Sequence, residues 1–221
     1  MKRMVLIALT VVLAFSLADA RRKKEYAGVV KDQVYQDGKY DFQIKINDNW
    51  KYNVGDVEAS TRLILIQKKY GIPTDYADAA DYTYIPKLVV WADTSNLGAP
   101  AFMDSLLNSN YKSKQKKVIM AEFDILSQSD LIPKGRIMRT MSGETAVVWD
   151  GEAKYAKDIA TSTSSDAVIH VNRKYHGMIV AMKHAGVMYL FHTMCEDEFR
   201  EAVAAEVTQM LNSIVFIKAA K

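Results

Sequence analysis

The period of the hydrophobic positions changes along the chain, and these changes divide it into predicted strands and helices. In residues 40–46 (YDFQIKI), apolar and polar side chains alternate, which predicts a half-buried strand. Short apolar runs bounded by turn residues predict further strands in RLILIQKKY, KLVVWAD, TAVVWDG and SDAVIHVNRKY. The run KKVIMAEFDIL (residues 116–126) fits a helix and a strand equally well, so its structure is left open.

The clearest signal is a pair of apolar runs in GMIVAMKHAGVMYLFHTM, covering residues 178–182 and 187–191. A short polar turn with Gly186 separates them, and glycine readily adopts the positive φ that such turns require. The pattern predicts an antiparallel hairpin. Neither run alternates cleanly, so we expect both faces of these strands to be covered.

After Glu196 the apolar positions recur at steps of three and four, which predicts an amphipathic C-terminal helix packed on the sheet. The positions on this stripe are Phe199, Val203, Val207, Met210, Leu211 and Ile214. The following NSIVFI indicates the helix end and a last short strand or tail. A second helix is predicted in PAFMDSLLNSNY, which starts with a proline and continues with helical spacing.

These elements amount to about six or seven strands and about two or three helices with antiparallel neighbours, which indicates an α+β layered sandwich rather than a βαβ repeat. The single cysteine excludes an internal disulfide, so the core must hold the fold. With four prolines, ten glycines and no internal repeat, the part after the N-terminal segment is predicted to form one domain.

The first 20 residues have the three parts of a secretory signal peptide: a basic start, an apolar run and an A-x-A pattern ending at Ala20. We therefore predict export with cleavage near Ala20, to a periplasmic or extracellular location. The domain organisation is then a signal peptide (1–20), a basic tail (21–25) and one α/β domain (26–221). An uncleaved membrane anchor is the alternative, since the basic residues 21–24 can hinder translocation.

Charge argues against nucleic acid as the partner. Removing Lys2, Arg3 and Asp19 with the leader reduces the 29 basic and 26 acidic residues to 27 and 25, which is nearly balanced. Two local basic runs, residues 21–24 and KSKQKK, remain candidates for contact with a membrane surface, with a solvated tail and a solvated loop as the alternatives. KSKQKK is also a candidate for contact with a protein partner. Its lysines are Lys112, Lys114, Lys116 and Lys117.

The stretch FHTMCEDEF places His192 and Cys195 before three acidic residues. The neighbouring carboxylates would stabilise a neutral thiol rather than a nucleophilic thiolate, and no CxxC or HxxxH completes a zinc site. We interpret the stretch as a strand end followed by a helix start, with the acids at the positive end of the helix dipole. Thr193 and Glu196 have the spacing of a capping box. No catalytic residue is assigned.

The histidines do not converge on a metal site. His184 lies at the tip of the predicted hairpin and His192 at the far end of its second strand, about 26 Å away along an extended chain. His170 and His176 flank VNRKY without further ligands nearby. We expect no metal and no cofactor, and neither a G-x-S-x-G elbow nor a glycine-rich phosphate loop is present in the sequence.

The segment DYADAADYTY offers a second candidate for contact with a partner. Its aspartates recur at a spacing that does not match a calcium loop. Its tyrosines are of the residue type enriched at interface hot spots, with coverage of a sheet edge as the alternative. These are Tyr76, Tyr82 and Tyr84.

Three stretches give the chain a resemblance to the PsbP-like fold family: YDFQIKINDNW, HGMIVAMKHAGVMYLFHTM and EDEFREAVAAEVTQMLNSIVF. They resemble the early strand leading to a tryptophan, the central hairpin and the closing helix of that family. The chain departs from the family where IND replaces a common proline before the tryptophan, and where GIPTDYADAADYTYIPK lengthens a connection. The resemblance implies a three-layer α/β/α sandwich around a mainly antiparallel sheet, and a non-catalytic binding or assembly role.

The leading hypothesis is an exported, non-enzymatic module that docks on an envelope or membrane-associated protein complex. One alternative is an envelope enzyme with a dispersed site built from His192, Cys195 and an acid; another is a secreted surface-interaction protein. We expect a protein partner, no nucleic acid and no cofactor, and the sequence leaves open whether a small ligand binds.

Overall fold

The computed structural model describes residues 25–69, 85–107, 130–160 and 168–217, with only the backbone described for 130–136, 153–160 and 168–173. Eleven strands lie in this part of the chain: β1 (Gly28–Lys31), β2 (Val34–Asp37), β3 (Phe42–Lys45), β4 (Trp50–Val54), β5 (Thr61–Gln67), β6 (Lys87–Thr94), β7 (Asp130–Met141), β8 (Glu144–Ala160), β9 (Val168–His184), β10 (Val187–Glu196) and β11 (Val215–Phe216). The helices are α2 (Ala99–Leu107), the 3-10 helix η2 (Asp197–Phe199) and α5 (Arg200–Asn212).

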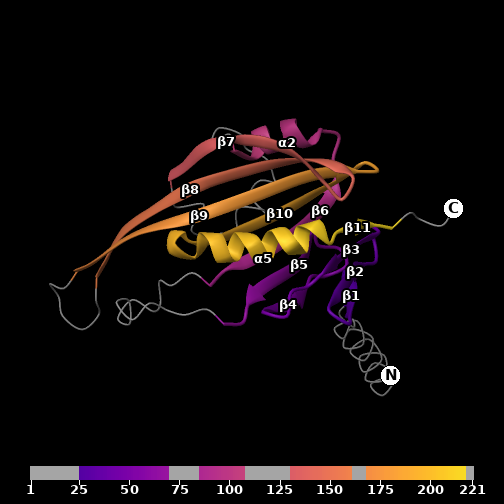
Figure 1. Cartoon of the computed structure of the whole chain (residues 1–221), viewed down its shortest axis with the longest axis horizontal. Coiled ribbons are helices and arrows are strands. Elements are labelled where there is room, and N and C mark those ends of the chain that lie inside the picture. Colours follow the sequence, from indigo (N-terminus) through magenta and orange to yellow (C-terminus); the bar gives the residue numbers. More distant parts are fainter. Residues whose placement is uncertain (1–24, 70–84, 108–129, 161–167, 218–221) are drawn as a thin grey trace, which may run out of the picture.

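The strands form two sheets whose described pairs are all antiparallel. The larger sheet has seven strands in the order β4-β5-β6-β10-β9-β8-β7, and the smaller has four in the order β1-β2-β3-β11. The smaller sheet lies beside the β4 end of the larger one (Figure 1). The predicted fold class is confirmed as α+β with a mainly antiparallel sheet, whereas the second sheet was not predicted.

The predicted hairpin is confirmed and is longer than its apolar runs. The β9–β10 turn holds Ala185 and Gly186 at φ of 47° and 84°, so the glycine lies in the conformation that it adopts without strain. The run SDAVIHVNRKY, predicted as a separate strand, is the first half of β9. Beyond the pair of Tyr175 with Glu196, β8 and β9 continue as a two-stranded ribbon that projects from the body (Figure 1).

The seven-stranded sheet carries a helix on each face. On one face α5 packs Val203, Val207 and Leu211 against a core that also holds side chains of both sheets. On the other face α2 packs Phe102 and Met103 over the indole rings of Trp91 and Trp149. The α/β/α layering predicted for the main sheet is therefore present, and the amphipathic stripe of the C-terminal helix is confirmed.

The start of the C-terminal helix differs from the prediction. β10 continues through Glu196, because Cys195 and Glu196 still pair with His176 and Tyr175 of β9. Glu196 then precedes η2 and makes no side-chain capping hydrogen bond. The predicted capping box of Thr193 with Glu196 is wrong, since both residues belong to a strand. Asp197 and Glu198 do occupy the first turn of η2, as the acidic run indicated.

A buried polar network joins the two sheets. Arg62 of β5 donates from Nε to Asp37 Oδ2 of β2 at 2.8 Å, and both side chains are fully buried. The Arg62 guanidinium also donates to the carbonyl oxygens of Val57, Ala59 and Ala27. The N–H donors of the buried Arg62 guanidinium are thus used in hydrogen bonds within the protein, and these bonds hold the smaller sheet against β5.

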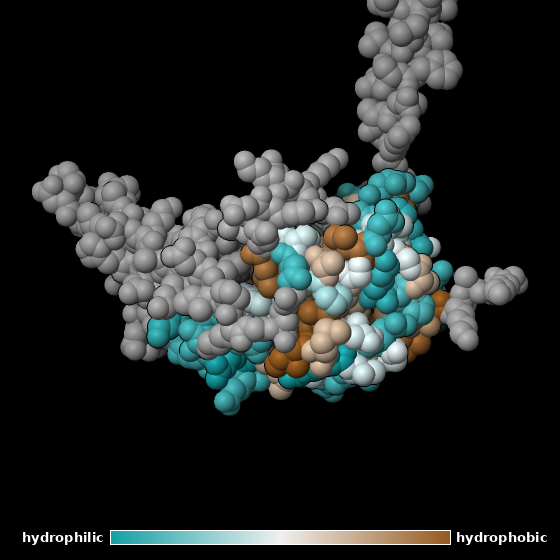
Figure 2. All heavy atoms as spheres, turned by 90° about the horizontal axis from the view of Figure 1, so that it is seen from above, coloured by the Kyte–Doolittle hydropathy of each residue, from teal (hydrophilic) through white to brown (hydrophobic). Residues whose placement is uncertain are grey.

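Apolar side chains on the surface are dispersed. The face in Figure 2 shows hydrophobic residues in separate groups among hydrophilic ones. The large apolar residues that are most exposed come from different elements, including Val29 of β1, Tyr52 of β4, Met138 of β7 and Val215 of β11. No helix in the described ranges is long and apolar enough to cross a membrane.

Candidate functional site

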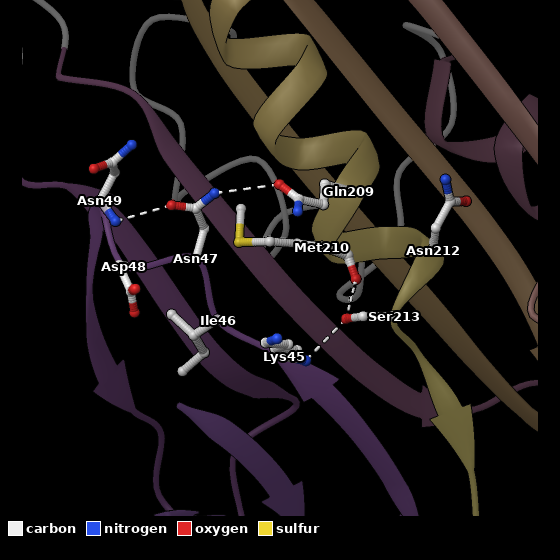
Figure 3. Close-up of a pocket in the computed structure, with 9 residues that line it drawn as sticks. All are labelled: Lys45, Ile46, Asn47, Asp48, Asn49, Gln209, Met210, Asn212 and Ser213. Atoms are coloured by element: carbon white, nitrogen blue, oxygen red, sulfur yellow. Dashed lines mark hydrogen bonds between the residues drawn. The ribbon is translucent and has the colours of Figure 1, made fainter. Parts of the chain in front are cut away.

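The candidate site is a pocket of about 500 Å³ where the end of β3 meets the end of α5 (Figure 3). One wall is formed by the segment 45–49 and the other by residues around the C-terminal end of α5. The lining residues are Lys45, Ile46, Asn47, Asp48, Asn49, Gln209, Met210, Asn212 and Ser213. Its volume lies within the range typical of small-molecule sites.

The first wall is shaped by a turn that the sequence dictates locally. Asn47 accepts a hydrogen bond at Oδ1 from the backbone N–H of Asn49 at 2.9 Å, and its carbonyl oxygen accepts from the N–H of Trp50. This is the turn chemistry typical of asparagine. It reverses the chain between β3 and β4 and turns the side chain of Asn47 toward Gln209 of α5, whereas the carboxylate of Asp48 points away from the helix (Figure 3).

The second wall is held by hydrogen bonds that reach across the pocket. Ser213 Oγ donates to the carbonyl oxygen of Met210 at 2.6 Å and accepts from the backbone N–H of Lys45 at 2.9 Å. Nδ2 of Asn47 donates to Oε1 of Gln209 at 3.4 Å, a long bond. The walls are therefore fixed relative to each other before any ligand enters.

Glu206 lies on α5, one turn before the pocket, and holds the turn between β3 and β4 against the helix. Its Oε2 accepts a hydrogen bond of 2.6 Å from the indole N–H of Trp50, and its Oε1 accepts from Nδ2 of Asn49 at 2.8 Å. Trp50 is almost completely buried, so its N–H needs such a partner. The tryptophan that follows the early strand thus anchors α5 and orients the turn that lines the pocket.

The bottom of the pocket is apolar and its rim is polar. Ile46 and Met210 are buried, and in Figure 3 they lie between the Asn47–Gln209 pair and the Lys45–Ser213 pair. Lys45, Asp48 and Gln209 are exposed on the rim. Because Ile46 and Met210 are almost completely buried, a ligand at this pocket would meet mainly polar side chains.

Several polar groups on the rim have no partner within the described residues. These groups are Nζ of Lys45, Nε2 of Gln209 and the side-chain amide of Asn212, so all three can donate to a ligand. Asp48 uses Oδ1 to accept from Nε2 of Gln33 at 3.1 Å. The rim therefore offers donors from one ammonium and two amides, together with a carboxylate.

The chemistry of the lining favours binding over bond cleavage. Its functional groups are four amides, one ammonium, one carboxylate and one hydroxyl, with no histidine or cysteine. Amides do not transfer protons at neutral pH, and the Ser213 hydroxyl donates to a carbonyl rather than to a base. A nucleophile–base pair is thus lacking among the described residues of this pocket.

The alternative site built on His192 and Cys195 is not assembled. The two residues are three apart on β10, so their side chains point to opposite faces of the sheet. Cys195 belongs to the core under α5, while His192 lies between Val89 and Ile179 on the face that carries α2. A direct hydrogen bond between the two side chains would have to pass through the sheet.

Protonation states at these two positions also oppose nucleophilic chemistry. Burial, followed by the charges of Asp197 and Glu196, raises the pKa of the Cys195 thiol to about 12. Burial lowers the pKa of His192 to about 3. The register does place Cys195 opposite His176, whose Nε2 lies 3.1 Å from Oδ1 of Asp150, but a thiol with so high a pKa supplies almost no thiolate at neutral pH.

His184 and His192 lie apart, as the predicted hairpin indicated. His184 ends β9 and bonds Glu144 Oε1 through Nδ1 at 2.7 Å, with its ring stacked on Phe216 at 4.3 Å. His192 lies further along β10 on the opposite strand of the hairpin. In the described ranges, no three His, Cys, Asp or Glu side chains form a group that could hold a metal ion.

The residues predicted to contact a partner lie outside the described part of the chain, and their role stays a prediction. They are Tyr76, Tyr82, Tyr84, Lys112, Lys114, Lys116 and Lys117. The pocket itself was not predicted from the sequence, because its walls come from segments more than 150 residues apart. Asn47-Asp48-Asn49 signals a turn in the sequence, yet no local pattern shows what that turn faces.

No known protein family matches the sequence, and no curated protein does. Comparison with solved structures does find relatives in fold. The cyanobacterial PsbP (CyanoP) of Synechocystis sp. PCC 6803 matches with a TM-score of 0.50 and 11% identity over 86% of this chain and 98% of that one. The chain therefore has the PsbP-like fold, which confirms the resemblance seen in its sequence.

Two further structures match more weakly. LpqN, described as involved in cell envelope biogenesis of Mycobacterium tuberculosis, has a TM-score of 0.45 and 9% identity over 79% of this chain and 82% of its own. The protein PA94 of Pseudomonas aeruginosa, of unknown function, has a TM-score of 0.40 and 14% identity over 80% and 94% of the two chains.

Proposed function

We propose that the chain is an exported, non-catalytic binding module that docks on an envelope or membrane-associated protein complex through the pocket between β3 and α5. The observation that carries this proposal is the composition of the pocket lining: amides, one ammonium and one carboxylate around a buried apolar bottom. Such groups recognise a partner by hydrogen bonding and shape without transforming it. The signal-peptide pattern over residues 1–20 supports the exported location.

The preformed walls support the same proposal. Ser213 and Gln209 already hold the β3–β4 segment against α5, so a partner meets a rim that needs little reordering. Preorganisation of this kind lowers the entropy lost on association. The opposite placement of His192 and Cys195 leaves the enzymatic alternative without a described catalytic pair.

The test is capture of tagged full-length protein from the envelope fraction of its native host, with mass spectrometry of the leader junction and of co-purifying proteins. Three proteins are compared: the wild type, a pocket variant carrying Lys45→Glu and Gln209→Ala, and a control carrying Lys51→Glu and Asn53→Ala. Lys51 and Asn53 are exposed on β4 and do not line the pocket.

We expect a mature N-terminus at Arg21 and one stoichiometric partner that the wild type and the control retain and the pocket variant loses. A cleaved monomer without a partner would contradict the proposal. Retention of the partner by the pocket variant would also contradict docking through this pocket. Turnover by the purified wild type on a panel of hydrolase substrates would show that the module is an enzyme.

A further inference from the structure

The outer edge of the seven-stranded sheet is a long strand with exposed apolar side chains, at the opposite end of the sheet from β4 (Figure 1). β7 has 12 residues, whereas the other edge strands of the described sheets are short: β4 has five residues, β1 four and β11 two. A long edge leaves many backbone groups unpaired. We infer that β7 pairs with β7 of a second copy of the chain, a contact separate from the pocket of the proposed function.

Pairing through β7 extends the core on both faces of the sheet. Ile137 and Met138 are 51% and 55% exposed, and they pair with Val148 and Val147 of β8. Val148 is buried in the core under α5, and Val147 is buried in the core under α2. The continuous core therefore ends at β8, and β7 leaves one large apolar side chain half exposed on each face. A further strand covers both.

The turn between β7 and β8 determines which backbone groups of β7 face outward. Ser142 and Gly143 alone separate the two strands, and both have positive φ, as a type I′ turn requires. The residues flanking such a turn exchange hydrogen bonds, and bonded and non-bonded pairs then alternate. Counted from Met141 in steps of two, Ile137 directs its backbone groups to β8. Met138 directs its N–H and C=O groups to the open edge.

The second half of β7 is the part that is suited to strand addition. The register with β8 shifts between Pro133 and Arg136. Lys134 and Gly135 therefore lie opposite one residue, Asp150, in a β-bulge. Proline lacks the N–H that pairing requires, and a bulge interrupts the ladder. Residues 136–141 contain neither.

Two-fold symmetry limits how two β7 edges can pair. A strand pairs with its own copy in antiparallel orientation, with one residue opposite itself on the axis. An axis at Arg136 or Arg139 places two arginine positions directly opposite each other, which is unfavourable. An axis at Met138 or Ile137 places two identical apolar residues there. Only the axis at Ile137 brings Arg139 opposite Gly135 of the second copy.

The axis at Ile137 allows an ion pair between the copies. Arg139 is exposed and lies on the α5 face, because its partner on β8, Ala146, belongs to the core under α5. Asp150 is four residues further along β8, so it lies on the same face, and its side chain is 52% exposed. In the dimer, Gly135 separates the two residues across two strand spacings, about 10 Å. Glycine has no side chain that would block the arginine.

The carboxylates nearest to these two residues do not prevent this pair. Asp150 accepts from Nε2 of His176 at 3.1 Å, and a neutral imidazole leaves the charge of the carboxylate in place. Glu144 lies diagonally from Arg139 within one copy, but it bonds Nδ1 of His184 on β9 at 2.7 Å and so turns away from β7. Arg139 has no ion-pair partner among the described residues.

The experiment measures dimerisation by sedimentation equilibrium at pH 8, where imidazole is ordinarily neutral, over a concentration series. The chain is expressed at full length and purified from the envelope fraction. The samples are the wild type, Arg139→Asp, Asp150→Arg and an equimolar mixture of the two variants. Lys51→Asp and Glu201→Arg, alone and mixed, are controls with the same charge changes outside β7 and β8. All four positions are exposed, and thermal unfolding checks that each variant folds.

We expect a wild-type dimer with a dissociation constant in the micromolar range, because short paired edges bury less than the about 1,200 Å² of a standard interface. Each variant alone should dimerise about tenfold more weakly, since like charges then face each other at both symmetric sites. The mixture should return to within about threefold of the wild type, because each new charge meets its opposite on the other variant. The controls should dimerise as the wild type does.

Cysteine variants test the register. Ile137→Cys should form a disulfide between copies under mild oxidation, because the Cα atoms of a non-hydrogen-bonded pair lie about 4.5 Å apart. Met138→Cys should not, since its positions in the two copies are offset by two residues, which separates their Cα atoms by about 8 Å. The native Cys195 is buried.

A wild type that is monomeric at every concentration would overturn the inference. A dimer that Arg139→Asp leaves unchanged, or a mixture that dimerises no better than the single variants, would do the same. A disulfide in Met138→Cys instead of Ile137→Cys would move the axis and remove the ion pair. If Asp150→Arg does not fold, Arg139→Asp and the two cysteine variants decide the outcome.

Discussion

Arg62 and Asp37 form a fully buried ion pair, 2.8 Å from Nε to Oδ2, that joins β5 of the large sheet to β2 of the small one. Asp37 Oδ1 also accepts from the backbone N–H groups of Lys39 and Tyr40, and its Oδ2 accepts from the Tyr35 hydroxyl. Burial and the hydrogen bond to Asp37 together raise the pKa of Tyr35 far above its usual value, so the phenol stays a donor. This contact between the sheets is therefore charged, buried and hydrogen-bonded.

Removing one partner of this pair should be costly. Arg62→Met is expected to lower the free energy of unfolding by about 3–5 kcal/mol, because Asp37 would stay buried without its counter-ion. Urea unfolding followed by circular dichroism measures the change. Arg200→Met is the control, since Arg200 is half exposed and 3.9 Å from Asp197, and should cost less than about 1 kcal/mol. Equal losses in the two variants would show that the buried pair does not hold the sheets together.

Glu206→Ala should loosen α5 and the pocket turn together. The substitution leaves the buried indole N–H of Trp50 and the amide of Asn49 without their acceptor, at an expected cost of about 1.5–3 kcal/mol. Urea unfolding by tryptophan fluorescence measures the loss. Glu206→Gln retains an acceptor oxygen and should lose less, and Glu201→Ala, at an exposed position of the same helix, should lose almost nothing. A red-shifted native emission in Glu206→Ala alone would place the disturbance at Trp50.

Stability should fall in acid because of His192. Its pKa is about 3 in the folded chain, where burial disfavours the charged ring, against a usual 6.5, so the unfolded chain takes up a proton first as the pH falls. The folded state then loses about 1.4 kcal/mol per pH unit between these values. Above pH 6.5 the residue has no such effect. In His192→Met, the free energy of unfolding should fall less steeply as the pH drops below 6.5. An unchanged pH dependence would show that His192 does not cause the fall.

Cys195 should lower the stability of the fold at high pH. Its thiol pKa is about 12 in the folded chain against a usual 9.0, so above pH 9 the unfolded chain loses its proton first and folding becomes less favourable. The same burial predicts that a thiol reagent labels native protein slowly near neutral pH and labels urea-unfolded protein rapidly. Labelling at equal rates in the two states would place the thiol at the surface.

Alanine substitutions at two glycines on neighbouring strands should destabilise the fold by different amounts. A Cβ at Gly151 would lie 2.3 Å from Cζ2 of Trp149, whereas one at Gly177 would lie 3.3 Å from Cζ3 of the same ring. Gly151→Ala is therefore expected to cost about 1–3 kcal/mol, and Gly177→Ala less, because overpacking displaces the indole. Gly38→Ala, where the nearest atom is 3.5 Å away, is the control and should be almost neutral. The reverse order in thermal unfolding would contradict this packing.

The elements that could be predicted from the sequence are those decided by side-chain period and local turn chemistry. The alternation around Phe42 and Ile44 identified β3, and Gly186 identified the hairpin turn. The helical stripe of Val203 and Val207 identified the face of α5 that packs on the core. These signals lie within a few residues of the elements that they specify, so no knowledge of partners is needed.

Prediction failed where pairing with a distant strand decides the structure. Thr193 and Glu196 have helix-start spacing, yet the backbone of β9 extends β10 past both. The strands β1 (GVVK) and β2 (VYQD) hold two large apolar side chains each, against the four that alternate across residues 40–46, so no period was visible there. The pocket was missed for the same reason: Gln209 and Asn47 lie far apart in the sequence, and long-range contacts such as the pairing of β11 with β3 bring them together. A one-dimensional pattern does not contain these long-range contacts.

The pairing of β11 with β3 also fixes when the chain can finish folding. Ser213 bonds the backbone of Lys45 across 168 positions, and Val215 pairs with Gln43 just beyond it. A nascent chain on the ribosome therefore leaves one edge of β3 without its strand until almost the whole described domain has been synthesised. Closure of this edge therefore depends on contacts of large sequence separation, which form slowly, so the small sheet is completed late in folding.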